Sequence, residues 1–339
     1  MRIRRLIVPG LCALAVAYFL TAGRLEQGAI ASQAPAVATG EALRHRVDRG
    51  LLMSDVRALA SPAFEGRRTS SPGGLKARQW IVDRFKALGL TPAGPSGYLE
   101  PFSFTHQSIR GVFTPGRPFR TTYSDAANVL GAIAGASASA KTIVISAHYD
   151  HLGVRDGAMY AGADDNASGI ATLLAIAAAF TGEHPVNRLV FAAFDAEELG
   201  LRGAETFVAS GLVPLDVIAL EVNMDMVSRN ERNEIFAAGT YQSPWLKPLL
   251  QDVQLRSGVR ILFGHDRPIH KAGSVEDWTD QSDQGAFADR GVPFVYFGVE
   301  DHADYHQPSD TADKIDQRFF GDAADMIVEA VKTFDAKVE

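Results

Sequence analysis

Apolar segments with the character of buried strands alternate with helical segments through the middle of the chain, and this alternation constrains the fold most. The strand-like segments are continuously apolar, which is typical of strands covered on both faces. They are Lys141–Asp150, Asn187–Glu198, Asp216–Val227 and Gly291–His302, and the helical segment Gly169–Phe180 separates the first two. This order predicts an α/β fold with a mixed, mostly parallel central sheet flanked by helices on both faces.

Further helices are predicted from apolar residues at helical spacing. They cover Glu41–Ala60, Leu75–Leu88 and Leu199–Ser210, and the composition of Glu65–Gly74 between the first two is typical of a loop. We find no internal repeat, no low-complexity tract and no dividing linker after residue 40. Residues 41–339 are therefore predicted to form one domain, which is long enough to bury a full core.

The N-terminus has the pattern of a targeting segment. Three arginines within the first five residues precede the apolar run Leu6–Ala22, which has 17 residues and lies at the short edge of a membrane span. Residues 1–31 are predicted to be a cleaved signal peptide or an uncleaved N-terminal anchor, and residues 32–40 a linker. Both alternatives imply export, to the periplasm or the cell exterior, or anchoring to the inner membrane.

Cysteine usage and charge narrow the chemistry. Cys12 is the only cysteine and lies in the targeting segment, so the exported part can form no disulfide and offers no thiolate ligand. Any metal must then bind His, Asp and Glu. The net charge is −7; residues 1–31 carry four arginines and one glutamate, a net of +3, which leaves −10 for the remainder. This acidic balance argues against nucleic acid as a partner.

Polar side chains gather where the predicted strands end, and α/β folds place their sites at that edge of the sheet. Each has an ordinary interpretation: a loop histidine is usually solvated, and paired glutamates before a helix complement its dipole. No such ordinary interpretation suits Asp225 as well, because it interrupts an apolar run and a buried aspartate is costly unless it is paired or liganded. The others are His148, Asp150 and His151 after the first strand, Glu197 and Glu198 after the second, and Tyr305 and His306 near the end.

The segment "GADDNASG" (Gly162–Gly169) adds Asp165, and by composition it is either an exposed turn or a cation site. Together these residues favour a metal centre, because His, Asp and Glu suit zinc, or less well manganese or cobalt. Five protein ligands exceed what one catalytic zinc takes, but suit two metals about 3.5–4 Å apart that share a carboxylate. The proposed ligand set is His148, Asp165, Glu198, Asp225 and His306.

Five ordered segments resemble the signature segments of the M28 family of zinc metallopeptidases, the co-catalytic aminopeptidases. They are "AHYDHLG", "GADDNASG", "FDAEELGLRGA", "NMDMVS" and "YHQPSDT". The resemblance extends over about residues 45–330 and includes "LASPAFEGRRTSSPGG", which is similar to bacterial members. It implies the aminopeptidase-like fold of the zinc exopeptidases and two Zn²⁺ per chain.

The resemblance also implies how the zinc ions are held. His148 and Asp225 would bind one zinc, Glu198 and His306 the other, and Asp165 would bridge both. In the family a cis peptide bond follows the bridging aspartate, which makes Asp165–Asn166 the expected position here.

Three further residues acquire catalytic roles through the resemblance. Glu197 is similar to the general base that takes a proton from the attacking water. Asp150 is similar to the carboxylate that accepts a hydrogen bond from the histidine ligand. Tyr305 is similar to a tyrosine that hydrogen-bonds the tetrahedral oxyanion, although a tyrosine here could also serve packing alone.

The sequence therefore predicts an exported zinc-dependent aminopeptidase acting on peptides with a free N-terminus. The alternatives are a glutaminyl cyclase, which shares the fold but uses one zinc, a carboxypeptidase or dipeptidase, and a non-catalytic binding domain. The loop Phe263–Gln284 is predicted to line the substrate cleft; Asp280 and Asp283 could hold a substrate α-amine, with a solvated loop as the commoner interpretation. Side-chain preference and oligomeric state are not predicted.

Overall fold

A mixed sheet runs through the part of the chain that the computed structural model describes, which is residues 47–107, 119–137, 140–267 and 276–338. The described residues belong to one compact unit. The predicted targeting segment and linker lie outside these ranges. No helix among the described residues combines the length and hydropathy needed to cross a bilayer.

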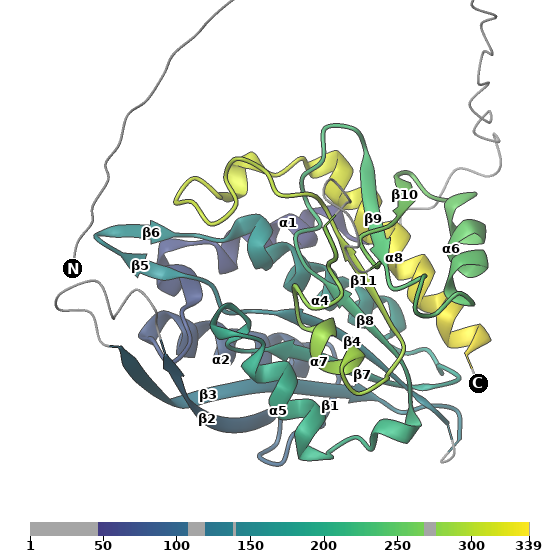
Figure 1. The fold of residues 1–339 in the computed structure, drawn as a ribbon, viewed down its shortest axis with the longest axis horizontal. Helices are drawn as coiled ribbons and strands as arrows, with labels where there is room; N and C mark the ends of the chain where they lie inside the picture. The colour runs from purple at the N-terminus through teal and green to yellow at the C-terminus, as the bar shows by residue number, and fades with distance from the viewer. Residues whose placement is uncertain (1–46, 108–118, 138–139, 268–275, 339) are drawn as a thin grey trace, which may run out of the picture. The chain divides into compact units, whose positions relative to one another are not determined.

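The sheet has nine strands in the order β1-β3-β7-β4-β8-β11-β9-β10, with β2 paired to β3 (Figure 1). The strands are β1 (Thr91–Pro92), β2 (Leu99–Gln107), β3 (Arg120–Ile133), β4 (Thr142–His148), β7 (Arg188–Phe194), β8 (Ile218–Met224), β9 (Glu234–Ala238), β10 (Arg260–Phe263) and β11 (Phe294–Gly298). A separate hairpin consists of β5 (Gly153–Arg155) and β6 (Ala158–Tyr160).

The four central strands β7, β4, β8 and β11 are parallel to one another. Antiparallel strands flank them, β3 beside β7 and β9 beside β11. The carboxyl ends of the central strands therefore lie at one edge, and the loops that leave them can meet there.

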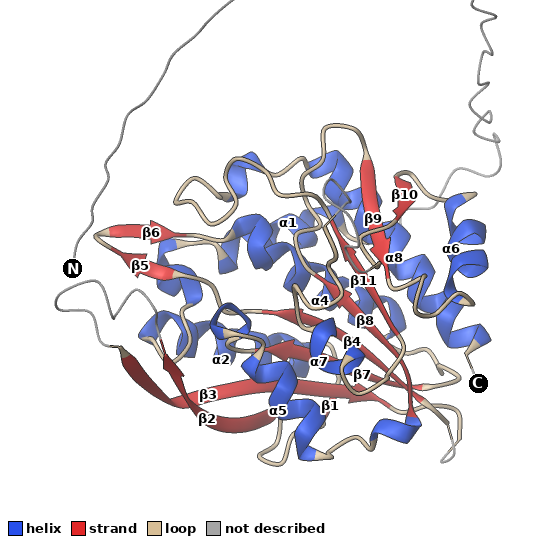
Figure 2. Ribbon diagram, viewed as in Figure 1, coloured by secondary structure: helices blue, strands red, loops and turns tan. Residues whose placement is uncertain are grey.

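Helices cover both faces of the sheet (Figure 2). The larger core cluster joins one face to α1 (Arg49–Leu59), α2 (Pro72–Ala87), α4 (Gly169–Phe180), α6 (Leu246–Gln254) and α8 (Gln317–Lys337). A smaller cluster joins the other face to α5 (Arg202–Ser210) and α7 (Gln284–Ala288).

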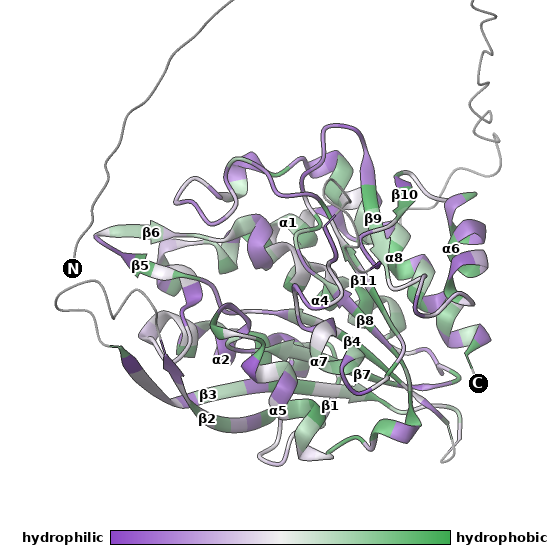
Figure 3. Ribbon diagram, viewed as in Figure 1, coloured by the Kyte–Doolittle hydropathy of each residue, from purple (hydrophilic) through white to green (hydrophobic). Residues whose placement is uncertain are grey.

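Strand β4 explains why the central segments are continuously apolar. Ile143 and Ile145 belong to the larger core cluster, and Val144 between them belongs to the smaller one. Because successive side chains point to opposite faces, both faces require apolar residues. In Figure 3 the central strands are accordingly coloured mainly as hydrophobic.

Helix α2 begins at Pro72 and not at Leu75 as predicted, so part of the expected loop is helical. Ser71 caps it, its hydroxyl accepting a hydrogen bond from the backbone N–H of Gly74, and Pro72 suits the first helical position because it lacks an N–H. The preceding Pro62–Arg67 forms a short 3₁₀ turn. The described part of the first predicted helix is α1, with Asp48 as its cap.

Candidate metal centre

The strand-end residues converge at the carboxyl edge of the central strands. His148 ends β4, Glu197 and Glu198 follow β7, and Asp225 directly follows β8. Asp165 comes from Ala163–Ser168, the irregular helical segment before α4. The loop after β11 supplies His306, which completes the five predicted ligands at this edge.

Three donor atoms form a first group: His148 Nε2, Asp165 Oδ1 and Asp225 Oδ1. The histidine nitrogen lies 3.4 Å from the Asp165 oxygen and 3.3 Å from the Asp225 oxygen. Donor atoms around a tetrahedral zinc lie about 3.3 Å apart, because the metal–ligand bonds are about 2.0–2.1 Å long. The spacing of this group therefore suits one zinc ion.

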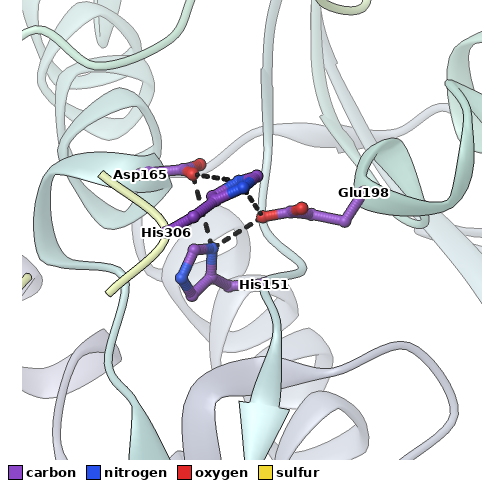
Figure 4. A group of neighbouring side chains, drawn as sticks. All are labelled: His151, Asp165, Glu198 and His306. Atoms are coloured by element: carbon purple, nitrogen blue, oxygen red, sulfur yellow. Dashed lines mark ion pairs between the residues drawn. The ribbon is translucent and has the colours of Figure 1, made fainter. Parts of the chain in front are cut away.

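A second group has four donor atoms: His151 Nδ1, Asp165 Oδ2, Glu198 Oε1 and His306 Nε2 (Figure 4). His306 Nε2 lies 3.0 Å from the Asp165 oxygen and 3.2 Å from the Glu198 oxygen. His151 Nδ1 lies 3.6 Å and 2.8 Å from the same two atoms. These separations lie on both sides of the distance of about 3.3 Å expected between donor atoms around a tetrahedral zinc.

Asp165 contributes a different carboxylate oxygen to each group. Oδ1 faces His148, and Oδ2 faces His151 and His306. This is the arrangement that a bridging carboxylate requires, and it is the one that the resemblance implies for this residue. The peptide bond between Asp165 and Asn166 is cis, also as expected.

Several buried donor atoms in the two groups lack a hydrogen-bond partner among the described residues. They are His148 Nε2, Glu198 Oε1, Asp225 Oδ1 and both ring nitrogens of His151. Leaving a buried polar group unsatisfied costs about 1–3 kcal/mol, so the four of these atoms that belong to the donor groups, which exclude His151 Nε2, call for a ligand. The residues present fit bound cations.

The hydrogen bond that orients His148 differs in part from the one predicted. The ring Nδ1–H donates to the backbone oxygen of Asp150 at 3.1 Å, while the Asp150 carboxylate lies 3.7 Å from that nitrogen. With Nδ1 protonated, the Nε2 lone pair faces the first donor group. The Asp150 carboxylate accepts a 2.9 Å hydrogen bond from the backbone N–H of Glu197, and so positions the predicted base.

The histidines of the cluster favour the ionised form of its carboxyl groups. Burial opposes ionisation of Asp165, yet His151, His148 and His306 hold the pKa of its carboxyl well below the ordinary value. Burial and the charge of Asp165 likewise oppose ionisation of Glu198, but His151 and His306 bring the pKa of Glu198 down to about 2. Both carboxylates are therefore ionised and available as ligands at neutral pH.

Glu197 behaves differently from its neighbour. Burial raises the pKa of Glu197 well above the ordinary value; His148 opposes the shift, and the charges of Glu198 and Asp225 add to it. Its Oε2 lies 3.9 Å from His148 Nε2, so the carboxylate stands beside the first donor group without belonging to it. A carboxylate with a raised pKa suits proton transfer near neutral pH.

The donor groups open into a pocket whose empty space, open solvent included, is about 580 Å³. Three aromatic side chains line it, namely Trp278, Tyr296 and Tyr305, and the ring of Tyr305 stacks on His306 with centroids 4.0 Å apart. Two further acids, Glu276 and Asp301, also line it. The pocket is thus acidic and aromatic beyond the donor groups themselves.

The predicted cleft loop Phe263–Gln284 contributes in part. Trp278 and Gln281 line the pocket, and residues 268–275 lie outside the described ranges. Neither aspartate suggested for the α-amine is among the lining residues: Asp280 is exposed, and Asp283 is fully buried.

Two buried residues that position the centre were not identified from the sequence. The guanidinium of Arg67 donates to four backbone oxygens, those of Leu59, Tyr149, Ala161 and Gly162. The Asp310 carboxylate accepts hydrogen bonds from the backbone N–H groups of Asp164 and Asp165. Both residues stand in the quoted segments, but residue type alone does not reveal a partner that is distant in the chain.

His151 was noted in the segment "AHYDH" but was assigned no ligand role. A loop has no fixed periodicity, so its spacing of three residues from His148 predicts nothing about a shared site. In the structure it adjoins Glu198 and Asp165.

Comparison with known proteins shows the family of this chain. The model of peptidase family M28 matches residues 128–331, more than half of the chain. A probable leucine aminopeptidase of Trichophyton verrucosum (strain HKI 0517) is 22% identical over 332 residues, which cover 92% of this chain and 83% of the relative.

Solved structures show the same fold at low sequence identity. A zinc aminopeptidase from Bacillus subtilis has a TM-score of 0.66 at 15% identity and covers 88% of this chain and 98% of its own. A glutaminyl cyclase from Bacteroides thetaiotaomicron has a TM-score of 0.64 at 15% identity, with coverage of 84% and 98%. The predicted fold class and the predicted enzyme class, a zinc-dependent metalloexopeptidase, are both confirmed. The chain belongs to peptidase family M28.

Proposed function

We propose that this chain is an exported aminopeptidase that binds two zinc ions and removes the N-terminal residue of peptides. The observation that carries the proposal is the pair of donor groups that share Asp165, with Glu197 beside them at the floor of an open pocket. Bound zinc would polarise the scissile carbonyl and lower the pKa of the attacking water.

Glu197 is the proposed general base. Its carboxylate lines the pocket, its backbone is held by Asp150, and its raised pKa favours accepting a proton from water and passing it to the leaving amine. Asp150 is thus a positioning residue in this scheme.

Tyr305 is the proposed donor to the oxyanion. Its side chain lines the same pocket as Glu197. Burial, with the nearby charges of Asp165 and Asp225, raises the pKa of the Tyr305 hydroxyl, which therefore stays protonated and able to donate a hydrogen bond.

The pocket favours a substrate with a free amino terminus. Glu276 and Asp301 add negative charge to a lining that contains no lysine or arginine among the described residues. A positively charged α-amine is attracted to such a pocket, whereas a free carboxylate meets no lysine or arginine among the described lining residues. This supports an aminopeptidase over a carboxypeptidase.

The donor count supports hydrolysis over a one-zinc cyclase. Such a cyclase needs one set of ligands, whereas this chain presents two sets of candidate donors, and each set contains two buried atoms without a hydrogen-bond partner among the described residues. Export is proposed on the sequence of residues 1–31, as a periplasmic or extracellular protein that either loses this segment or stays anchored by it.

Glu197→Gln tests the proposal. Glutamine keeps the shape of the side chain but cannot take a proton, so we expect wild-type zinc content and a fall in kcat of roughly 10²–10⁴-fold. The matched control is Glu231→Gln, at an exposed position away from the pocket. Normal turnover by the Glu197 variant would remove this residue from its role.

A panel of fluorogenic aminoacyl substrates and their N-acetylated counterparts, with and without a zinc chelator, tests the reaction class. We expect cleavage of the free-amine compounds only, and its loss with the chelator. Cleavage of blocked substrates would contradict the aminopeptidase assignment.

A further inference from the structure

His151 is a buried residue of the candidate metal centre and belongs to the loop that follows β4. Its side chain is fully buried, with 0% of its surface exposed. A Cβ placed on Gly162 would come within 2.6 Å of two atoms of the His151 ring, so the absence of a side chain there makes room for the imidazole. The surrounding chain is therefore shaped to admit this ring.

The His151 ring presents Nδ1 to the second donor group. Nδ1 lies 2.8 Å from Glu198 Oε1 and 3.6 Å from Asp165 Oδ2, the same two oxygens that His306 Nε2 faces at 3.2 Å and 3.0 Å. Figure 4 shows both imidazoles directed toward the space between the two carboxylates.

The short separation between His151 and Glu198 does not have the geometry of a well-formed hydrogen bond. Nδ1 and Oε1 both lack a partner of acceptable geometry among the described residues, although they are 2.8 Å apart. Two buried atoms at this distance that do not point at each other are placed as two ligands of one ion would be, each directed at a common third point.

We propose that His151 is a fourth protein ligand of the zinc position formed by Asp165, Glu198 and His306. This rests on the proposed zinc-dependent function and adds a ligand to the predicted set. The two positions then differ: one has four protein donors, the number typical of closed zinc sites, and the other has the three donors typical of sites that keep a place for water.

The difference has a measurable consequence. The four-donor position holds zinc more tightly than the three-donor position, so it fills first on titration and empties last on chelation. The three-donor position, next to Glu197, is the one that exchanges its zinc ion more readily.

Zinc titration of the metal-free protein against a chromophoric chelator tests the proposal in wild type, His151→Asn and His151→Gln. We expect two binding events in wild type, and in both variants a loss of about 10–100-fold or more in the affinity of the tighter event, with the weaker event retained. The matched control is His184→Asn, at an exposed position. Circular dichroism of the metal-free forms verifies that each variant is folded.

The outcomes separate the two hypotheses. If wild type and variants bind two zinc ions with the same affinities, the role of His151 is refuted while the two-zinc function stands. If the wild-type protein binds no zinc, the proposed function itself fails.

A second measurement requires no variant. Each imidazole bound to Co²⁺ gives a hyperfine-shifted, exchangeable ring N–H signal in ¹H NMR. The fully cobalt-loaded wild-type protein should give three such signals, from His148, His151 and His306. Two signals would overturn the proposal.

Discussion

Two neighbouring buried regions of this molecule contain similar charged residues but differ in whether those residues have hydrogen-bond partners. In the donor groups, His148, His151, Glu198 and Asp225 each leave at least one atom without a hydrogen-bond partner among the described residues. In the surrounding loop clamp, which we define as Arg67, Asp164, Asp195 and Asp310, each charged group is hydrogen-bonded.

Each charged group of the loop clamp is satisfied by hydrogen bonds. Asp164 accepts hydrogen bonds from the backbone N–H and the hydroxyl of Ser228, and Asp195 accepts from the N–H of Ala127 and the hydroxyls of Tyr149 and Thr69. Buried atoms without a hydrogen-bond partner also occur elsewhere among the described residues, at Glu221 and at both oxygens of Asp283 for example. The donor groups differ from these because their atoms lie within 4.8 Å of one another, so that one cation could satisfy several at once, whereas the clamp holds the loops that present them.

The largest expected effect comes from breaking the donor groups at their shared member. In Asp165→Ala both groups lose an oxygen, so we expect loss of zinc and a fall in activity of more than about 10³-fold, with the fold retained. Elemental analysis after dialysis and circular dichroism measure the two properties. Asp216→Ala, at an exposed position, is the control, and two zinc ions retained by the Asp165 variant would place the bridge elsewhere.

Breaking the loop clamp should give the opposite pattern, with stability lost in the metal-free protein. Burial lowers the pKa of Arg67 to about 10, despite the favourable charges of Asp165 and Asp310, so it remains charged at neutral pH. Arg67→Met leaves four backbone oxygens without their donor and should cost about 3–5 kcal/mol in the free energy of unfolding.

Urea unfolding of the metal-free Arg67 variant measures this effect. Arg57→Met, at an exposed position on α1, is the control and should lie within about 0.5 kcal/mol of wild type. An Arg67 variant as stable as this control would show that the clamp is not needed to hold the loops.

The smallest effect should come from a residue that lines the pocket but belongs to neither region. Tyr305→Phe removes only the hydroxyl, so we expect unchanged zinc content and unfolding free energy and a fall in kcat of about 10²-fold, with little change in KM. If the variant keeps the wild-type kcat, Tyr305 does not stabilise the oxyanion and only stacks on His306.

The central strands were predictable from sequence because burial on both faces leaves a local signal. Helix α4 occupies Gly169–Phe180, the predicted range, and β4, β7, β8 and β11 lie within the predicted segments. The long antiparallel pair β2 and β3 was not predicted. Much of β2 alternates between exposed and partly buried residues, so its identity as a strand depends on pairing with a distant segment.

The five predicted ligands were accessible from sequence because each stands at the end of an element and belongs to a quoted motif. The clamp residue Arg67 and the additional donor His151 were not accessible in this way. Arg67 acts on oxygens up to 95 residues away, and His151 is a loop residue whose direction no periodicity sets.

The sequence by itself determined the α/β character, the order of the central elements and the set of polar residues at their ends, because these follow from local hydropathy and residue type. Only the tertiary structure decided which atoms face one another. It assigned the two oxygens of Asp165 to different groups, directed Nδ1 of His151 into the second group, and gave the His148 hydrogen bond to the backbone of Asp150. Side-chain direction at a loop depends on contacts between segments far apart in the chain, and these exist only after folding.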